Sequence, residues 1–147
     1  MTPTIESLEE LIGHRLPGGS YTIEPYINWL TNDVVLADQP GGDVANPMFC
    51  YYGALAAMGI SIDDMFALAG ATADDGPMFG EAGIELSRPL TVGATYAVSG
   101  EITGAVRKEG KKTGVFDIVT FRIELNEPDG ELAAVSTNSF VFPRRES

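Results

Sequence analysis

The sequence predicts an α+β protein in which a curled antiparallel sheet wraps around one buried helix. Residues 48–58 (MFCYYGALAAM) carry no charged side chain, and a helix that is apolar on every side is normally enclosed by the rest of its domain. After residue 78 the chain alternates between apolar and polar residues in runs that turn signals separate, which is typical of long strands. One enclosed helix followed by a run of strands gives the α+β class.

The N-terminal third predicts two helices and one short strand. Residues 6–14 suit a short helix, and a strand over 21–24 follows. Pro25 then favours the first turn of a second helix, whose Ile27, Trp29 and Leu30 recur at helical spacing. Residues 38–46 are rich in Pro, Gly and Asp, so they form a loop.

The uncharged helix is expected to open at Asn46-Pro47, since Asn is a good N-cap and Pro a good first helical residue. Gly59 suits its C-terminal cap, and the polar stretch 61–77 leaves room for another short helix. The strand-like runs are 79–88, 95–106, 113–125 and 131–142, the last of them following the hairpin signal Pro128-Asp129-Gly130.

Length and composition predict one soluble cytoplasmic domain over residues 1–147. The single Cys50 excludes an internal disulfide. No stretch is long and apolar enough to span a bilayer, and the N-terminal residues lack a signal-peptide pattern. The net charge of −12 argues against nucleic acid, because phosphate neutralisation needs Lys and Arg.

The charge is unevenly distributed. Residues 1–87 hold 13 acidic residues and one base, whereas residues 88–147 hold eight of each. Arg107, Lys108, Lys111 and Lys112 fall together in a predicted turn. This turn is either a solvated hairpin tip or a contact for the phosphates of coenzyme A or a carrier protein.

Three stretches resemble the MaoC-like (R)-hydroxyacyl dehydratases and enoyl hydratases, chiefly the branch built like the N-terminal half of double-hot-dog enzymes. They are INWLTNDVVLAD, GGDVANPMFCYYGALAAMG and MFGEAGIELSRPLTVGATYAVSGEI. The motif from Arg88-Pro89-Leu90 to Gly93 is the most specific part. The resemblance implies a hot-dog fold, no cofactor and no metal. It also implies acid–base chemistry on acyl thioesters by an Asp and a His, with a backbone amide at the central helix N-terminus stabilising the enolate oxygen.

The histidine of that pair is missing. Asp33 falls at the family's aspartate position and Asp38 at the histidine position; a register shifted onto residues 46–48 instead takes Asp43 as the acid and puts Phe49 at the histidine position. Two carboxylates in one cleft push one pKa upward, so Asp33 and Asp38 form a candidate acid–base pair. Asp33 is equally well explained as a helix-end residue and Asp38 as a turn residue.

The remaining candidate residues would bind substrate. The resemblance and their apolar or amide character select Trp29, Asn46, Met48, Phe49, Tyr52, Phe79 and Gly80. The aromatic members equally suit a plain core. We expect His14 to be a surface residue and Cys50 a core thiol.

Three functions stay open at this stage. The chain is a lyase that acts on an acyl-CoA, carrier-protein-bound or polyketide thioester; or it is the non-catalytic, acyl-binding subunit of a heteromeric dehydratase; or it is a repurposed cyclase or isomerase acting on a related hydrophobic product. In each case a single hot-dog sheet leaves an edge strand open, which predicts a homodimer or a heterodimer with a second MaoC-like subunit.

Overall fold

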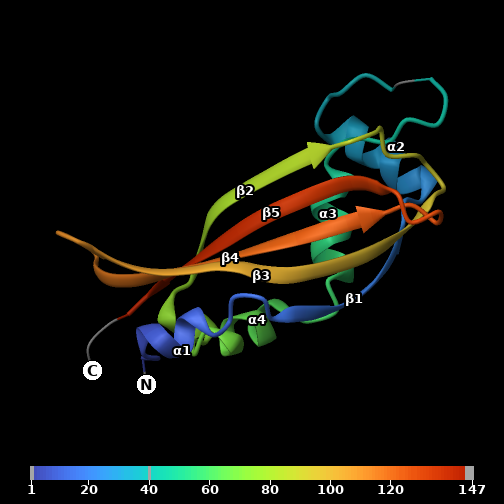
Figure 1. The fold of residues 1–147 in the computed structure, drawn as a ribbon. Coiled ribbons are helices and arrows are strands. Elements are labelled where there is room, and N and C mark those ends of the chain that lie inside the picture. Colours follow the sequence, from blue (N-terminus) through green and yellow to red (C-terminus); the bar gives the residue numbers. More distant parts are fainter. Residues whose placement is uncertain (1, 40, 145–147) are drawn as a thin grey trace.

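The computed structural model describes residues 2–39 and 41–144. One antiparallel sheet runs in the order β1-β3-β4-β5-β2, and the helix α3 (Phe49–Ala57) crosses one face of it (Figure 1). The α+β class with a sheet around a central helix is therefore confirmed. The strands are β1 (Arg15–Thr22), β2 (Met78–Leu86), β3 (Thr95–Gly110), β4 (Gly114–Asn126) and β5 (Leu132–Pro143).

The other helices follow the sequence expectations with shifted ends. α2 (Pro25–Val34) begins with Pro25 in its first turn, and α4 (Ile62–Leu68) is capped by the Ser61 side chain. α1 (Ile5–Glu9) ends earlier than residue 14, because turns replace the helix and the Gly13 N–H donates to the Ile102 carbonyl on β3. A 3-10 turn, η1 (Ala73–Asp75), precedes β2.

The first strand was wrongly placed. We expected residues 21–24, but β1 begins at Arg15 and passes through the Pro17-Gly18-Gly19 segment. The register of β1 against β3 shifts between Leu16 and Gly19, so the strand absorbs these residues as a bulge. A proline is tolerated there because β1 is an edge strand.

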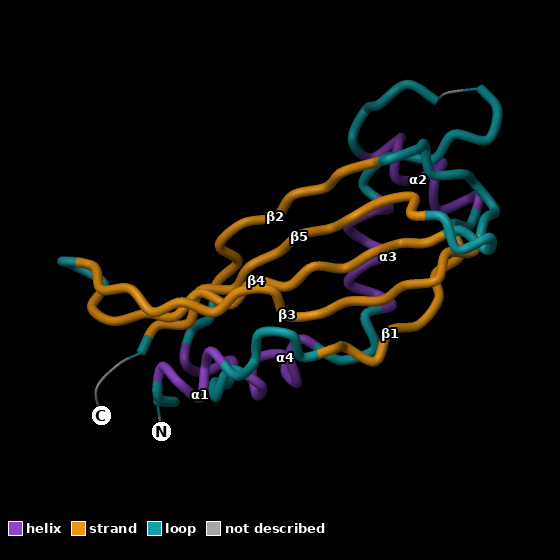
Figure 2. The backbone as a smooth tube through the Cα atoms, in the orientation of Figure 1, coloured by secondary structure: helices purple, strands orange, loops and turns teal. Residues whose placement is uncertain are grey.

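The core lies between α3 and the inner face of the sheet. On β4, Val119, Phe121, Ile123 and Leu125 alternate toward the helix and are buried. Gly53 lets β1 approach, since a Cβ atom there would lie 3.0 Å from the Tyr21 ring. β3 and β4 are longer than the other strands. Their hairpin therefore projects past the rest of the sheet, at the opposite end from α2 (Figure 2).

The expected basic turn is only partly a turn. Arg107 lies within β3, and its guanidinium binds the fully buried Asp117 carboxylate (Nε to Oδ1, 2.7 Å) and the Pro3 carbonyl (2.8 Å). Arg144 binds the other oxygen of Asp117 (Nε to Oδ2, 2.6 Å) and also the Ala69 carbonyl. Burial alone raises the pKa of Asp117, but the two arginines outweigh it and hold that pKa below its ordinary value.

The strand β2 is the open edge of the sheet. It pairs with β5 on one side, and all nine of its residues are exposed. Its register shifts between Phe79 and Glu81, which makes Gly80 the extra residue of a bulge. Among the described residues, no helix has the length and apolar character needed to cross a bilayer.

Candidate functional site

A cleft of about 540 Å³ lies between the loop that joins α2 to α3 and the segment that follows β2. One wall comes from α2 and the loop, and the other from the end of β2 and the Arg88-Pro89-Leu90 segment. The lining is mostly apolar with a few polar groups, as is usual for a small-molecule site. The lining residues are Asn32, Ala37, Asp38, Val44, Ala45, Asn46, Pro47, Leu86, Ser87, Arg88, Pro89 and Leu90.

Two asparagines on α2 turn toward the core. Asn28 and Asn32 are one helical turn apart, so they share a face, and they are 8% and 2% exposed. Buried amides need hydrogen-bond partners. Both find them at Asn46, at the start of the turn that leads into α3.

Asn46 is the centre of this amide network. Its backbone N–H donates to Asn28 Oδ1 (2.8 Å), and its side-chain Nδ2 donates to Asn32 Oδ1 (2.7 Å). Its own Oδ1 accepts from the Met48 backbone N–H (2.9 Å). The expectation that the helix opens at Asn46-Pro47 is wrong by two residues: α3 begins at Phe49 with Met48 as its N-cap, and Asn46 caps the short turn that precedes it.

The loop between α2 and α3 is attached to the same network. Asn32 Nδ2 donates to Gln39 Oε1 (3.3 Å), and Gln39 Nε2 donates to the Trp29 carbonyl (3.0 Å). The loop starts with Leu36 in the left-handed region (φ 55°), where its side chain is 92% exposed. Such a conformation costs a bulky residue about 1 kcal/mol or more. Two backbone hydrogen bonds that end α2 accompany it, from the Leu36 N–H to the Asp33 carbonyl (3.1 Å) and from the Ala37 N–H to the Asn32 carbonyl (2.8 Å).

The opposite wall is held by the sheet. The Ala45 N–H donates to the Leu90 carbonyl (2.8 Å), and the Thr91 N–H donates to the hydroxyl of the buried Tyr96 (2.8 Å). Arg88 is bound to Glu127 Oε2 (2.7 Å) at the β4–β5 turn. Its guanidinium is therefore already neutralised at the mouth of the cleft.

The N-terminal amides of the central helix are satisfied within the chain. The Met48 N–H is bound by Asn46 Oδ1, the Phe49 N–H by the Asn46 carbonyl and the Cys50 N–H by the Pro47 carbonyl. An enolate oxygen requires a donor that is free to point at it. In this arrangement the Met48 N–H is already bound to Asn46 Oδ1.

The two candidate acids differ in position. Asp38 is exposed and lines the cleft beside Asn46 and Arg88. Asp33 is exposed on α2 and is not among the residues that line the cleft. The inward position next to Asp33 is held by Asn32.

The candidate aromatic residues divide between a second hollow and the surface. Phe49 and Tyr52 line an apolar groove of about 320 Å³ with Tyr21 and residues of α2. Phe49 is itself fully buried. Trp29 and Met48 are partly exposed, and neither is among the described residues that line the cleft or the groove.

The candidates on β2 lie elsewhere. Phe79 is half exposed and packs on Phe140, with ring centroids 4.6 Å apart. Gly80 forms the bulge, where a Cβ atom would lie 2.9 Å from Ser139 Oγ. Its requirement for glycine is therefore explained by the sheet.

Two further expectations are confirmed. Cys50 is fully buried, and burial raises the pKa of its thiol to about 11 against a smaller lowering effect from a backbone hydrogen bond of Glu85. It is a protonated core thiol at neutral pH. His14 is exposed between α1 and β1.

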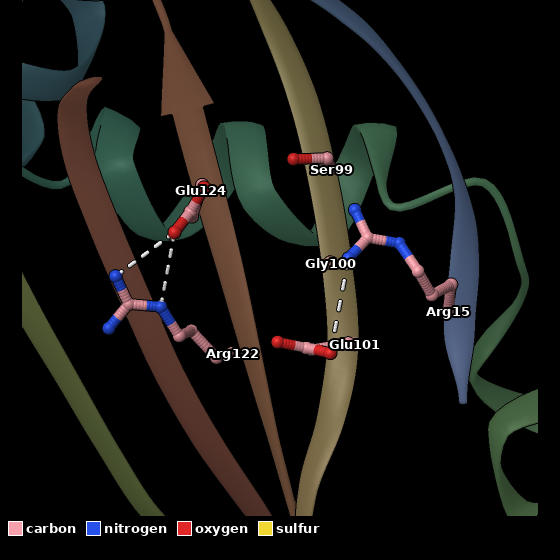
Figure 3. A pocket seen from close by; sticks show the side chains of 6 residues that line it. All are labelled: Arg15, Ser99, Gly100, Glu101, Arg122 and Glu124. Atoms are coloured by element: carbon pink, nitrogen blue, oxygen red, sulfur yellow. Dashed lines mark hydrogen bonds and ion pairs between the residues drawn. The ribbon is translucent and has the colours of Figure 1, made fainter. Parts of the chain in front are cut away.

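A charged hollow on the outer face of the sheet carries no comparable chemistry. Arg122 binds Glu124 (3.0 Å) and Arg15 approaches Glu101 (4.0 Å), so the charges balance (Figure 3). The hollow measures only about 80 Å³. We interpret it as two solvated ion pairs, one within β4 and one between β1 and β3.

Sequence reasoning missed Asn28, Asn32 and Gln39 as members of the site. A signal was present, since placing Pro25 in the first helical turn puts positions 28 and 32 on one face among apolar residues. Two amides on an otherwise apolar face predict a buried polar network.

Neither protein-family models nor curated protein sequences match the chain. Solved structures do match its fold. The ChsH1–ChsH2 complex from Mycobacterium tuberculosis has a TM-score of 0.73 at 14% identity, over 97% of this chain and 92% of the other. The MaoC-like dehydratase from Rhodospirillum rubrum has a TM-score of 0.58 at 16% identity, over 95% and 98%.

This protein has the hot-dog fold of the MaoC-like dehydratases. A further hot-dog structure agrees: the HadBC (3R-hydroxyacyl-ACP dehydratase) complex from Mycobacterium tuberculosis, with a TM-score of 0.67 at 18% identity, over 96% of this chain and 99% of the other. The sequence expectation of a MaoC-like hot-dog fold is therefore confirmed.

Proposed function

We propose that this hot-dog protein is the acyl-thioester-binding subunit of a MaoC-type dehydratase or hydratase, and that a second hot-dog subunit supplies the acid–base residues. The observation that carries the proposal is the amide network centred on Asn46. In this network Asn32 fills the inward position of α2, and Asn46 accepts the Met48 backbone N–H just before the central helix.

The chemistry explains why this network matters. Adding water across an enoyl thioester requires a base that takes a proton from water and an acid that protonates C2. Neutral amides such as Asn32 and Asn46 do neither, because they do not titrate near neutral pH. They suit a binding site, because their hydrogen bonds to one another and to Met48 and Gln39 hold two segments of the cleft lining together.

The composition of the cleft supports the same division of labour. Its apolar residues, among them Val44, Leu86 and Leu90, give the acyl part a surface to pack against. Two of the similar structures, ChsH1–ChsH2 and HadBC, are complexes. A hetero-oligomer is thus a known use of this fold.

A second candidate function rests on Asp38. Asp38 lies in the cleft lining, so this one carboxylate would act as the general base of a complete enzyme, or of a cyclase or isomerase that needs only proton abstraction. Asp33 is not among the residues that line the cleft, so this candidate does not use it.

The test compares the purified chain alone with the chain mixed with a hot-dog subunit that carries an Asp–His pair and is encoded beside it. Hydration of a crotonyl-type thioester is followed in both samples, and binding of a non-reactive thioether analogue is measured by calorimetry. We expect the isolated chain to bind the analogue without hydrating the thioester. We expect hydration only in the mixture.

Loss of a positioned acid or base typically costs about 10² to 10⁴ in rate, so the two samples should differ by at least that factor. Turnover by the chain alone at the rate of the mixture would refute the proposal and favour Asp38. The Asn46→Ala variant should weaken analogue binding, whereas Gln39→Ala, changed at the exposed end of the network, should weaken it less.

A further inference from the structure

We infer that the open edge strand β2 is built to reject a second copy of this chain and to pair with the edge strand of a different hot-dog subunit that carries basic side chains. The inference rests on the proposed function and deepens it by naming the chemistry of the partner. Glu81 and Glu85, two residues either side of Gly83, carry the argument.

The straight part of β2 offers a complete pairing surface. From Glu81 to Leu86 it runs in unbroken register with β5, so the backbone groups on its other side are free to bind another strand. Figure 1 shows it at the margin of the sheet. All of its residues are exposed, and an exposed edge of this length is a template for pairing with another strand.

The inner face of the edge supplies apolar area. Ala82, Ile84 and Leu86 point to the side of the sheet that α3 covers, opposite the buried Asn138, Ser136 and Ala134 of β5. Ile84 and Leu86 are nevertheless each 38% exposed. A partner strand with its own helix would cover them.

The outer face sets the specificity. Side chains alternate along a strand, so Glu81, Gly83 and Glu85 lie on one face. In the antiparallel self-pairing centred on Gly83, Glu81 of each copy faces Glu85 of the other. Like charges directly opposite one another destabilise a strand pair. The self-pairing centred on Ile84 removes the direct clash but leaves the Glu85 carboxylates as diagonal neighbours.

Arg122 shares the outer face with these carboxylates, but it lies two strands away on β4 and is bound to Glu124. Within residues 2–39 and 41–144, neither Glu81 nor Glu85 takes part in an ion pair. Their partners on β5 are Ser139 and Val135, which are uncharged. The net charge of −12 adds general repulsion between two copies. Lys or Arg at the facing positions of a partner strand would convert both repulsions into attractions.

The experiment needs no natural partner, because the chain can be given a complementary copy of itself. The variant Glu81→Lys/Glu85→Lys is mixed in equal amounts with the native chain, and association is measured by sedimentation and native mass spectrometry. The matched control is Glu9→Lys/Glu10→Lys, which makes the same charge change at two exposed residues at the end of α1.

We expect the mixture to form a one-to-one dimer at least about tenfold tighter than either protein forms alone, since two cross-strand pairs change sign. The advantage should shrink in 0.5 M salt. A mixture of the control variant with the native chain should associate within about twofold of the native chain alone. The neutral Glu81→Gln/Glu85→Gln variant should self-associate more than the native chain.

The inference is overturned if the native chain dimerises as tightly as the mixture, or if the mixture shows no preferred association. Circular dichroism on each variant establishes that it is folded before the comparison. No substrate enters these measurements. A failure here therefore rejects the charge rule at the edge, while a failure of the turnover test rejects the binding-subunit function.

Discussion

The side-chain amide of Asn46 donates to the side-chain carbonyl of Asn32 across 2.7 Å, and this one bond joins the loop before the central helix to the inner face of α2. It therefore connects two segments that line the cleft. It also explains why the inward position of α2 carries an amide, since a carboxylate there would be buried at 2% exposure and would need a positive partner.

Replacing Asn46 by alanine should lower the free energy of unfolding by about 1–3 kcal/mol, because Asn32 loses its buried donor and the Met48 N–H loses its cap. Urea denaturation measures the change. The control is Gln39→Ala at the exposed end of the network, with an expected loss of less than about 1 kcal/mol. Equal losses in the two variants would contradict a buried network centred on Asn46.

The Asp117→Asn variant should be destabilised by about 3–5 kcal/mol, because the variant leaves Arg107 and Arg144 near the core without a counter-charge. Glu101→Gln, which breaks only a 4.0 Å exposed contact with Arg15, serves as the control and should cost less than about 1 kcal/mol. A small loss at both positions would mean that the buried cluster is not a structural element.

The same cluster predicts a pH dependence. The folded-state pKa of Asp117 lies below the ordinary value of 3.8. The stabilisation is therefore fully present above that ordinary value and is lost as the pH falls through it toward the folded-state pKa. Thermal melts between pH 7 and pH 2.5 should show the difference between native and Asp117→Asn proteins narrowing on the acid side. A constant difference would contradict the assignment.

Two glycines of β2 give a matched test of the bulge. A Cβ atom at Gly80 would lie 2.9 Å from Ser139 Oγ and 3.0 Å from Val141 Cγ2, whereas one at Gly83 would meet nothing within 4 Å. Gly80→Ala should therefore cost about 1 kcal/mol or more, and Gly83→Ala should be neutral or slightly stabilising. Denaturant midpoints for the pair measure this, and the reverse order would argue against the bulge geometry.

Local signals predicted much of this fold. Pro25, the Asn46-Pro47 pair and the turn at residues 128–130 start or join elements through backbone preferences that act over a few residues. The uncharged stretch predicted α3 through the cost of burying charge. These effects depend on residues that are adjacent in the sequence, so they can be predicted from the sequence alone.

The missed features depend on partners that are distant in sequence. Asp117 is buried because Arg144 reaches it from 27 residues away, and the buried amide of Asn32 finds its donor at Asn46. β1 crosses the Pro17-Gly18-Gly19 segment, which locally signals a break, because it is an edge strand and pairs with β3. Composition alone indicates none of these pairings.

The last prediction concerns Asp38, the one candidate acid that lines the cleft. In the complex with an Asp–His partner subunit, Asp38→Asn should change KM by a few-fold and leave kcat within about twofold, because an exposed rim carboxylate affects binding and not proton transfer. Asp33→Asn, outside the cleft lining, is the control and should change neither. Losing a general acid or base would instead lower kcat by about 10² to 10⁴. A kcat loss of that size for Asp38→Asn alone would assign the chemistry to this chain and reject its role as a binding subunit.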